Sequence, residues 1–326
     1  MSGRAGEFLL PLLMACIAAG GVAKATETTP CNLTRLAEIP ARIDSGNLLI
    51  DVQIGGHPAQ MKIGTRQRFS FISPQLVEAM KLRRHDVTGD RIADDAGAKV
   101  SSWVDVPDLA IGEVKGTSAR FMVQGENARD RLPWDGVIGA DILAHYDVEL
   151  DPAHGKVNLF LPNQCNGRAA YWTQNFETLK FDLRRSMIEF DVPLEGQTIK
   201  ADLDTADADT TLDEPTAHQR FKVDPQESPT SSEGKTTTDT GIAVAFHRHR
   251  FANLEIGGVG FHNTEIGIVS VKSEVRFNHY AENDFQAMIH KLDPAPLWIG
   301  MHHLARLRLM IAYGEGLLYV SAADAS

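Results

Sequence analysis

An internal repeat constrains the fold of this 326-residue chain more than any other feature of its sequence. Two runs of alternating apolar residues lie 140 positions apart and share four apolar positions, namely Leu48, Ile50, Val52 and Ile54 in the first run and Ile188, Phe190, Val192 and Leu194 in the second. Alternation with a period of two is typical of a half-buried strand. Each run reaches a glycine at the same separation, Gly56 and Gly196, and a second strand-like run follows it. Each copy therefore predicts a strand, a turn and a strand.

Two further blocks repeat in the same order along the chain. Residues 109–112 resemble residues 254–257, and residues 137–143 resemble residues 298–304, so the separation grows to 145 and then to 161. Collinear blocks of this size predict two similar parts rather than a solenoid of many repeats. Each copy consists mostly of short strand-like runs between Gly, Asp and Pro turns, and a short helix is expected after the glycine of the last block. We therefore expect a mainly β, bilobal protein.

The repeat also gives the expected domain boundaries. We expect a signal peptide at residues 1–25, an N-terminal segment at 26–45, a first lobe at 46–162, a connector at 163–183 and a second lobe at 184–322. Within the second lobe, residues 226–240 are rich in Ser, Thr, Pro, Glu and Lys, which predicts a mobile loop or hairpin. Composition leaves open whether this loop is a surface insertion or a flap that covers a ligand.

The N-terminus has the pattern of an export signal. Arg4 precedes an apolar stretch that runs from Phe8 to Ala19, which is too short to span a bilayer comfortably. The stretch is followed by small residues, and we expect cleavage before Thr26. A lipoprotein cleavage site at Cys16 is the alternative. No later run approaches about 18 apolar residues, so we expect a protein without a transmembrane segment, exported to the periplasm or the extracellular space.

The net charge and the number of cysteines argue against some kinds of binding partner and some kinds of fold. The chain carries 32 Lys and Arg against 43 Asp and Glu, a net charge of −11, which argues against a nucleic-acid partner. Three cysteines are too few for a disulfide-built scaffold or a four-cysteine zinc site. Cys31 and Cys165 remain after cleavage, and an even pair in an oxidising compartment predicts one disulfide. Two separately buried thiols are the alternative.

Several motifs lie in the repeated blocks or beside them. They are Leu203-Asp204-Thr205-Ala206 and Trp298-Ile299-Gly300 in the second copy, Ile138-Gly139 in the first, and the segments around Cys31 and Cys165. With these motifs the chain resembles a known family, the two-lobed aspartic proteases of the pepsin and retropepsin type, most closely the secreted bacterial retropepsin-like group. The resemblance covers roughly residues 31 to 321. It implies a bilobal acid-protease fold with a cleft between two β-barrel-like lobes, and aspartic endopeptidase activity without a cofactor.

The family's chemistry needs one aspartate from each lobe. Two close carboxylates share one proton, because both cannot ionise cheaply, and they act together as general acid and general base. The resemblance implies that Asp204 is the retained second-lobe aspartate and that Thr205 supports its loop. The repeat, however, places Gly64 opposite Asp204 and Arg66 opposite Ala206.

A glycine has no proton to exchange, and the positive charge of Arg66 favours an ionised Asp204. We therefore expect a weak or inactive homologue that binds a peptide or protein in the interlobe cleft.

The sequence is also compatible with two other functions. One is an active endopeptidase whose second group is unidentified or comes from another chain. A second is a calcium-stabilised structural protein, suggested by the acidic run of Asp202, Asp204, Asp207, Asp209 and Asp213, although Ala206 and Asp207 occupy the positions where an EF-hand needs an oxygen ligand and a glycine. The histidine pairs His247 and His249, and His302 and His303, are interpreted as a basic strand and a short helix rather than as a zinc site.

Overall fold

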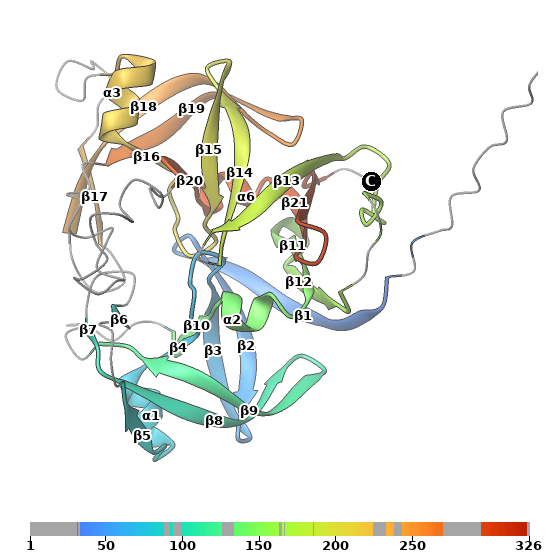
Figure 1. Ribbon diagram of the computed structural model, residues 1–326, viewed down its shortest axis with the longest axis vertical. Helices are drawn as coiled ribbons and strands as arrows, with labels where there is room; N and C mark the ends of the chain where they lie inside the picture. The colour runs from blue at the N-terminus through green and yellow to red at the C-terminus, as the bar shows by residue number, and fades with distance from the viewer. Residues whose placement is uncertain are drawn as a thin grey trace, which may run out of the picture. The chain divides into compact units, whose positions relative to one another are not determined.

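Strand pairing in the computed structural model follows the repeat of the sequence (Figure 1). The structure describes residues 31, 33–87, 92–93, 99–125, 134–162, 165, 167–184, 186–223, 233–237, 243–269 and 295–324. The predicted signal peptide, the Cys16 alternative and most of residues 226–240 lie outside these ranges. Residues 32–326 form one compact unit. Among the described residues, no helix is both long enough and apolar enough to cross a lipid bilayer.

The protein is mainly β, as the sequence predicts. The first copy contains β1 (Arg35–Asp44), β2 (Asn47–Ile54), β3 (His57–Ile63), β4 (Phe71–Ile72), α1 (Pro74–Ala79), β5 (Arg84–Asp86), β6 (Ile92–Ala93), β7 (Lys99–Val100), β8 (Ser102–Ile111), β9 (Val114–Val123), β10 (Gly136–Ile138), α2 (Ala140–Leu143), β11 (Asp147–Asp151), the 3-10 helix η1 (Pro152–His154) and β12 (Lys156–Phe160). The second contains β13 (Glu177–Arg184), β14 (Met187–Leu194), β15 (Gln197–Leu203), β16 (Thr211–Asp213), α3 (Glu214–Phe221), β17 (Glu233–Thr237), β18 (Ala243–Ile256), β19 (Val259–Val269), β20 (Leu297–Ile299), α6 (Met301–Leu304), β21 (Leu307–Ala312) and β22 (Leu317–Ala322).

Corresponding strands of the two copies pair in the same way. β2 and β3 form an antiparallel hairpin, as do β14 and β15. β10 lies parallel to β3 and antiparallel to β4, and β20 has the same relation to β15 and β16. The turn glycines Gly56 and Gly196 have φ of +80° and +72°, a left-handed conformation that glycine adopts without strain. The predicted strand, turn and strand of each copy are therefore confirmed.

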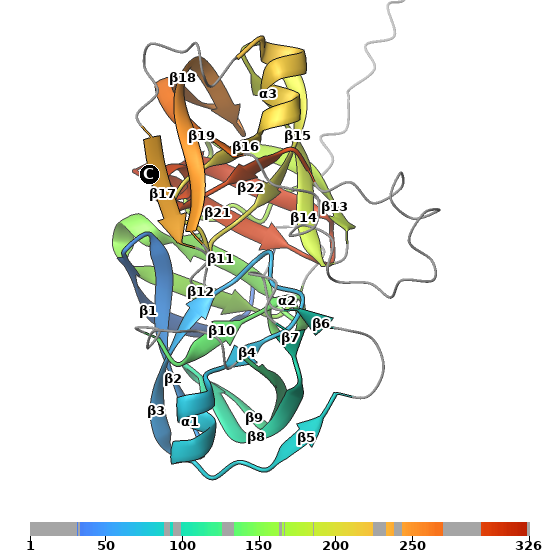
Figure 2. The same cartoon turned by 90° about the vertical axis from the view of Figure 1, so that its left-hand side faces the viewer.

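Six antiparallel strands join the two copies in the order β1, β12, β11, β21, β22, β13 (Figure 2). At the middle of this arrangement, Val148 lies opposite Ile311 and Leu150 lies opposite Leu309. The sequence repeat relates position 148 to 309 and position 150 to 311. The pairing therefore stays the same when the two copies are exchanged.

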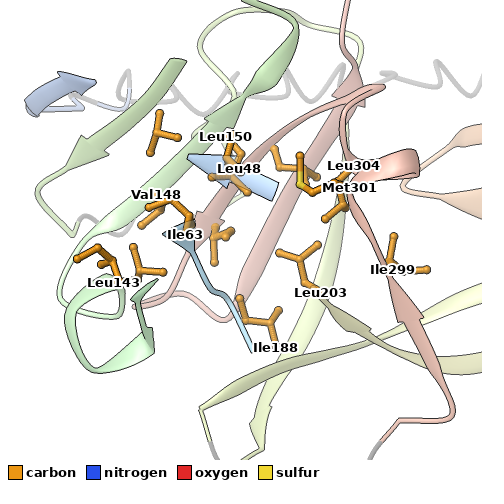
Figure 3. Close-up of a cluster of buried hydrophobic side chains, with 14 of the residues drawn as sticks. Leu48, Ile63, Leu143, Val148, Leu150, Ile188, Leu203, Ile299, Met301 and Leu304 are labelled. Atoms are coloured by element: carbon orange, nitrogen blue, oxygen red, sulfur yellow. The ribbon is translucent and has the colours of Figure 1, made fainter. Parts of the chain in front are cut away.

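The apolar positions that alternate in the sequence supply the core. Ile50, Val52 and Ile54 on β2 are buried, whereas Asp51 and Gln53, which alternate with them, are exposed. One continuous cluster of buried side chains extends through both copies, and Figure 3 shows part of it, where Leu48, Ile63, Leu143, Val148, Leu150, Ile188, Leu203, Ile299, Met301 and Leu304 are labelled. Burial of this surface is the main favourable contribution to folding. The core also fixes the positions of β3 and β15, which lead into the loops of residues 64–66 and 204–206, and of their neighbours β10 and β20.

The short helices after the repeated glycines are present. α2 follows Gly139 and α6 follows Gly300. A Cβ atom on either glycine would overlap backbone atoms of the facing loop, which explains why both positions lack a side chain. Cys31 and Cys165 are joined in a disulfide, which confirms that prediction.

Candidate functional site

The loops that follow β3 and β15 meet at equivalent positions of the repeat. The N–H of Gly64 donates to the carbonyl oxygen of Ile138 at 3.0 Å, and the N–H of Asp204 donates to that of Ile299 at 3.0 Å. Each loop therefore leaves its strand beside the apolar-apolar-glycine motif of its own copy. Residues 64–66 lie against residues 204–206, because Thr65 and Thr205 form hydrogen bonds with each other.

Thr65 and Thr205 hold the two loops together by reciprocal hydrogen bonds. The N–H of Thr65 donates to Oγ1 of Thr205 at 3.1 Å, and the N–H of Thr205 donates to Oγ1 of Thr65 at 3.1 Å. The hydroxyl of Thr65 donates to the carbonyl of Leu203 at 2.6 Å, and that of Thr205 donates to the carbonyl of Ile63 at 2.7 Å. Both threonines are fully buried, so these bonds satisfy groups that water does not reach.

Arg66 forms an ion pair with Asp204 across the two copies. Nη1 of Arg66 donates to Oδ2 of Asp204 at 2.9 Å, and Oδ1 accepts from the N–H of Ala206 at 3.0 Å. The guanidinium carbon also lies 4.1 Å from the centre of the Trp298 ring, within the range of a cation–π interaction. The side chain of Asp204 is only 5% exposed. A charge-assisted bond in such a poorly solvated place is stronger than one at the surface.

Asp202 is a second carboxyl group at the site, which the sequence analysis did not assign to it. Its Oδ2 lies 3.6 Å from Nε of Arg66, and its side chain is 1% exposed. Among the described residues, neither of its carboxyl oxygens has a hydrogen-bond partner. Burial raises the pKa of Asp202 to about 7, with smaller raising effects of Glu189 and Asp204 and an opposing effect of Arg66. Asp202 is therefore a group that changes charge near neutral pH.

Lys62 occupies the position of the first copy that corresponds to Asp202. It is fully buried, and its Nζ donates to the carbonyl of Ala206 at 3.3 Å and lies 4.9 Å from the centre of the Trp134 ring. Two cations of the first copy, Lys62 and Arg66, thus contact the loop of the second. The 140-residue separation relates Lys62 to Asp202 directly, and this signal could have identified the pair.

Gly64 leaves no space for a side chain at the position opposite Asp204. A Cβ atom on Gly64 would overlap Cγ of Gln67 and would lie 2.7 Å from Cγ1 of Val137. Ala206 does not have a positive φ, so it carries none of the strain that a left-handed backbone gives to a residue with a side chain. The first loop is therefore packed around glycine rather than around an acidic side chain.

The remaining acidic residues of the run have other contacts. Asp209 pairs with Arg248 at 3.2 Å, and Asp213 caps α3 by accepting from the N–H of Thr216 at 2.7 Å. Over the part of the chain that the structure describes, no group of three or more His, Cys, Asp or Glu side chains is arranged to hold a metal ion.

The histidines of the second copy differ in their surroundings. His303 is 1% exposed, and its ring nitrogens lie 2.7 Å from Oγ1 of Thr210 and 2.6 Å from Oγ1 of Thr264. Burial lowers the pKa of His303 to about 4, so its ring is neutral at neutral pH. Thr210 also accepts from the N–H of Gly300 at 3.0 Å. His302 is exposed, and His247 and His249 lie on β18.

Comparisons with known proteins were made by sequence and by structure. No protein-family model matches the sequence, and no curated protein matches it significantly. Among solved structures, the chain is similar to basic 7S globulin from soybean, with a TM-score of 0.49 and 9% sequence identity over 91% of this chain and 96% of that one.

Proposed function

We propose that this chain is an exported protein with the bilobal pepsin-like fold, which binds an extended peptide or a segment of a partner protein between its lobes without cleaving it. The observation that supports the proposal is the ion pair between Arg66 and Asp204. Peptide hydrolysis by the aspartic mechanism needs two carboxyl groups, one from each lobe, that exchange protons with water and with the scissile carbonyl. Arg66 cannot accept a proton, and Gly64 supplies no ionisable group.

Binding does not need the missing carboxylate. An extended peptide gains affinity by forming backbone hydrogen bonds with strands, and its side chains give specificity. The proposed peptide site would lie beside the loops of residues 64–66 and 204–206, in the place implied by the family resemblance. The disulfide of Cys31 and Cys165 is compatible with export, because such bonds persist in oxidising compartments.

The test is to measure binding and cleavage on the same samples. A set of extended peptides of varied sequence would be titrated against the purified full mature chain, followed by mass spectrometry of each peptide after long incubation. We expect saturable binding with every peptide recovered intact. Absence of binding throughout the set would refute the proposed function, and recovery of fragments would instead support an active endopeptidase.

The other candidate functions predict different results. An endopeptidase that needs Asp204 from two chains would show a specific activity that rises with protein concentration. A calcium-stabilised structural protein would melt at a higher temperature when calcium is added and at a lower one after chelation. Neither dependence is expected for a monomeric peptide-binding protein without a metal.

A further inference from the structure

Arg66 contacts the second copy in the way that a bound ligand contacts its receptor. Its guanidinium group meets two carboxyl groups, at 2.9 Å for Asp204 and 3.6 Å for Asp202, and its carbon atom lies 4.1 Å from the centre of the Trp298 ring. All three contacted groups belong to the second copy, whereas Arg66 belongs to the first. A planar cation between carboxylates and an aromatic face is the arrangement that selects guanidinium over ammonium.

The three receptor groups are positioned by contacts that do not involve Arg66. Oδ1 of Asp204 accepts from the N–H of Ala206 at 3.0 Å, and Nε1 of Trp298 donates to the carbonyl of Ala295 at 2.9 Å. Asp202 lies on β15, where its backbone pairs with Glu189 on one side and with Trp298 on the other. The receptor should therefore keep its shape when the Arg66 side chain is absent.

Charge also favours a cation in this place. The charged groups that act on Asp202 are Arg66, Glu189, Asp204 and Arg184. Neither oxygen of its buried carboxyl group forms a hydrogen bond among the described residues, so the group is oriented toward a cation without being saturated by donors. If the guanidinium of Arg66 leaves, two poorly solvated carboxyl groups lose their closest positive charge, which is costly unless another cation replaces it.

We propose that Asp202, Asp204 and Trp298 form a receptor for a guanidinium group, that Arg66 fills it as an internal ligand, and that an arginine side chain of a bound peptide is the external ligand that takes its place. The proposal rests on the proposed function, because it names the side chain that the peptide site accepts. A tethered internal ligand competes at an effective concentration on the order of millimolar, so wild-type protein should bind arginine weakly.

The test uses Arg66→Ala and two small probes, N-acetyl-L-arginine amide and its neutral isostere N-acetyl-L-citrulline amide. Binding would be followed by calorimetry and by the fluorescence of the tryptophans. We expect Arg66→Ala to bind the arginine probe at least 10-fold more tightly than wild type does, and at least 10-fold more tightly than it binds the citrulline probe. Adding Asp204→Asn should remove most of this gain.

Two controls keep the result interpretable. Arg120→Ala removes another arginine that stacks on a tryptophan, since the guanidinium carbon of Arg120 lies 3.7 Å from the centre of the Trp103 ring. The carboxylate that pairs with Arg120, Asp105, is half exposed, so this variant should not bind the arginine probe. Arg66→Met fills more of the space and replaces Arg66→Ala if the latter does not fold, as judged by thermal melting. Equal binding of the two probes to the folded Arg66 variant, or no binding at all, would overturn the proposal.

Failure here is distinguishable from failure of the proposed function. The small probes report on the receptor alone and do not need an extended peptide site. Binding of peptides to wild type without any arginine preference in the Arg66 variant would leave the proposed function standing and remove the receptor.

Discussion

Nη1 of Arg66 in the first copy lies 2.9 Å from Oδ2 of Asp204 in the second, so a cation of one loop meets the acidic residue of the corresponding loop. The pair is poorly exposed, at 20% for the arginine side chain and 5% for the aspartate. It places an arginine, not a second carboxyl group, beside Asp204. The consequences for stability, pH dependence and catalysis can each be measured.

Thr65→Val and Thr205→Val should each destabilise the fold by about 1–3 kcal/mol. Each hydroxyl donates to a carbonyl of the other copy and accepts an N–H, so valine leaves two buried polar groups unpaired. Urea denaturation of both single variants and of the double variant would measure this. Each substitution removes a different pair of these bonds, so the double variant should lose about the sum of the two singles. Thr205→Ser keeps the hydroxyl and should retain most of the stability; a loss in Thr205→Ser as large as in Thr205→Val would contradict the role of the hydroxyl bonds.

Asp202→Asn should change how stability depends on pH. The folded protein raises the pKa of Asp202 from 3.8 to about 7 through burial, so the folded state binds an extra proton between these values. The contribution of Asp202 is therefore fully present below pH 3.8 and is lost as pH rises through 7. Relative to wild type, the asparagine variant should gain up to about 4 kcal/mol between pH 4 and pH 8. A difference between the two proteins that is constant over this range would exclude the shift.

Arg308→Met should destabilise the fold by about 3 kcal/mol or more. Its guanidinium pairs with the fully buried Glu149 at 2.6 Å, and truncation leaves that carboxylate with Asn158 and Tyr171 as its donors among the residues that the structure describes. The matched control is Arg250→Met, because the pair of Arg250 with Glu265 is exposed on both sides and should contribute less than about 1 kcal/mol. Equal losses in the two variants, measured by urea denaturation, would contradict the role of burial.

Restoring a first-copy carboxylate should need more than one substitution. Gly64→Asp alone would overlap the side chain of Gln67, so we expect it to fold poorly. Gly64→Asp with Gln67→Ala, Arg66→Gly and Ala206→Gly removes the closest overlap and the competing cation, and leaves only the side chain of Val137 to shift. This combination is expected to produce peptide cleavage above the wild-type level. The same combination with Asp204→Asn is the inactive control. Cleavage that survives Asp204→Asn would show that the activity has another origin.

Much of the strand arrangement could be predicted from the sequence, because the same alternating apolar runs and turn glycines occur in both copies of the repeat. The hairpin glycines and the helices α2 and α6 fall where the sequence places them. The helices α1 and α3 were missed although their signals were present, since Ser73 and Asp213 are capping residues followed by proline in the first turn.

The site was only partly predictable. The repeat shows that Gly64 lies opposite Asp204 and that Arg66 lies opposite Ala206. It does not show the contact of Arg66 with Asp202 and Trp298, which depends on packing between distant segments. His303 is a similar case. The hydroxyls of Thr210 and Thr264 form hydrogen bonds with both nitrogens of its buried ring, and these residues lie 93 and 39 positions away in the chain.

The decisive measurement is the rate of peptide-bond hydrolysis by purified, monomeric wild-type protein acting on an unfolded protein substrate between pH 3 and pH 7, with Asp204→Asn measured in parallel. We expect wild type and Asp204→Asn to behave alike, with little or no cleavage, because Arg66 and Gly64 leave no second carboxyl group from the first copy to exchange protons. A wild-type rate ordinary for enzymes, roughly 1 per second or more, that is abolished in Asp204→Asn would show instead that the protein is an active aspartic endopeptidase.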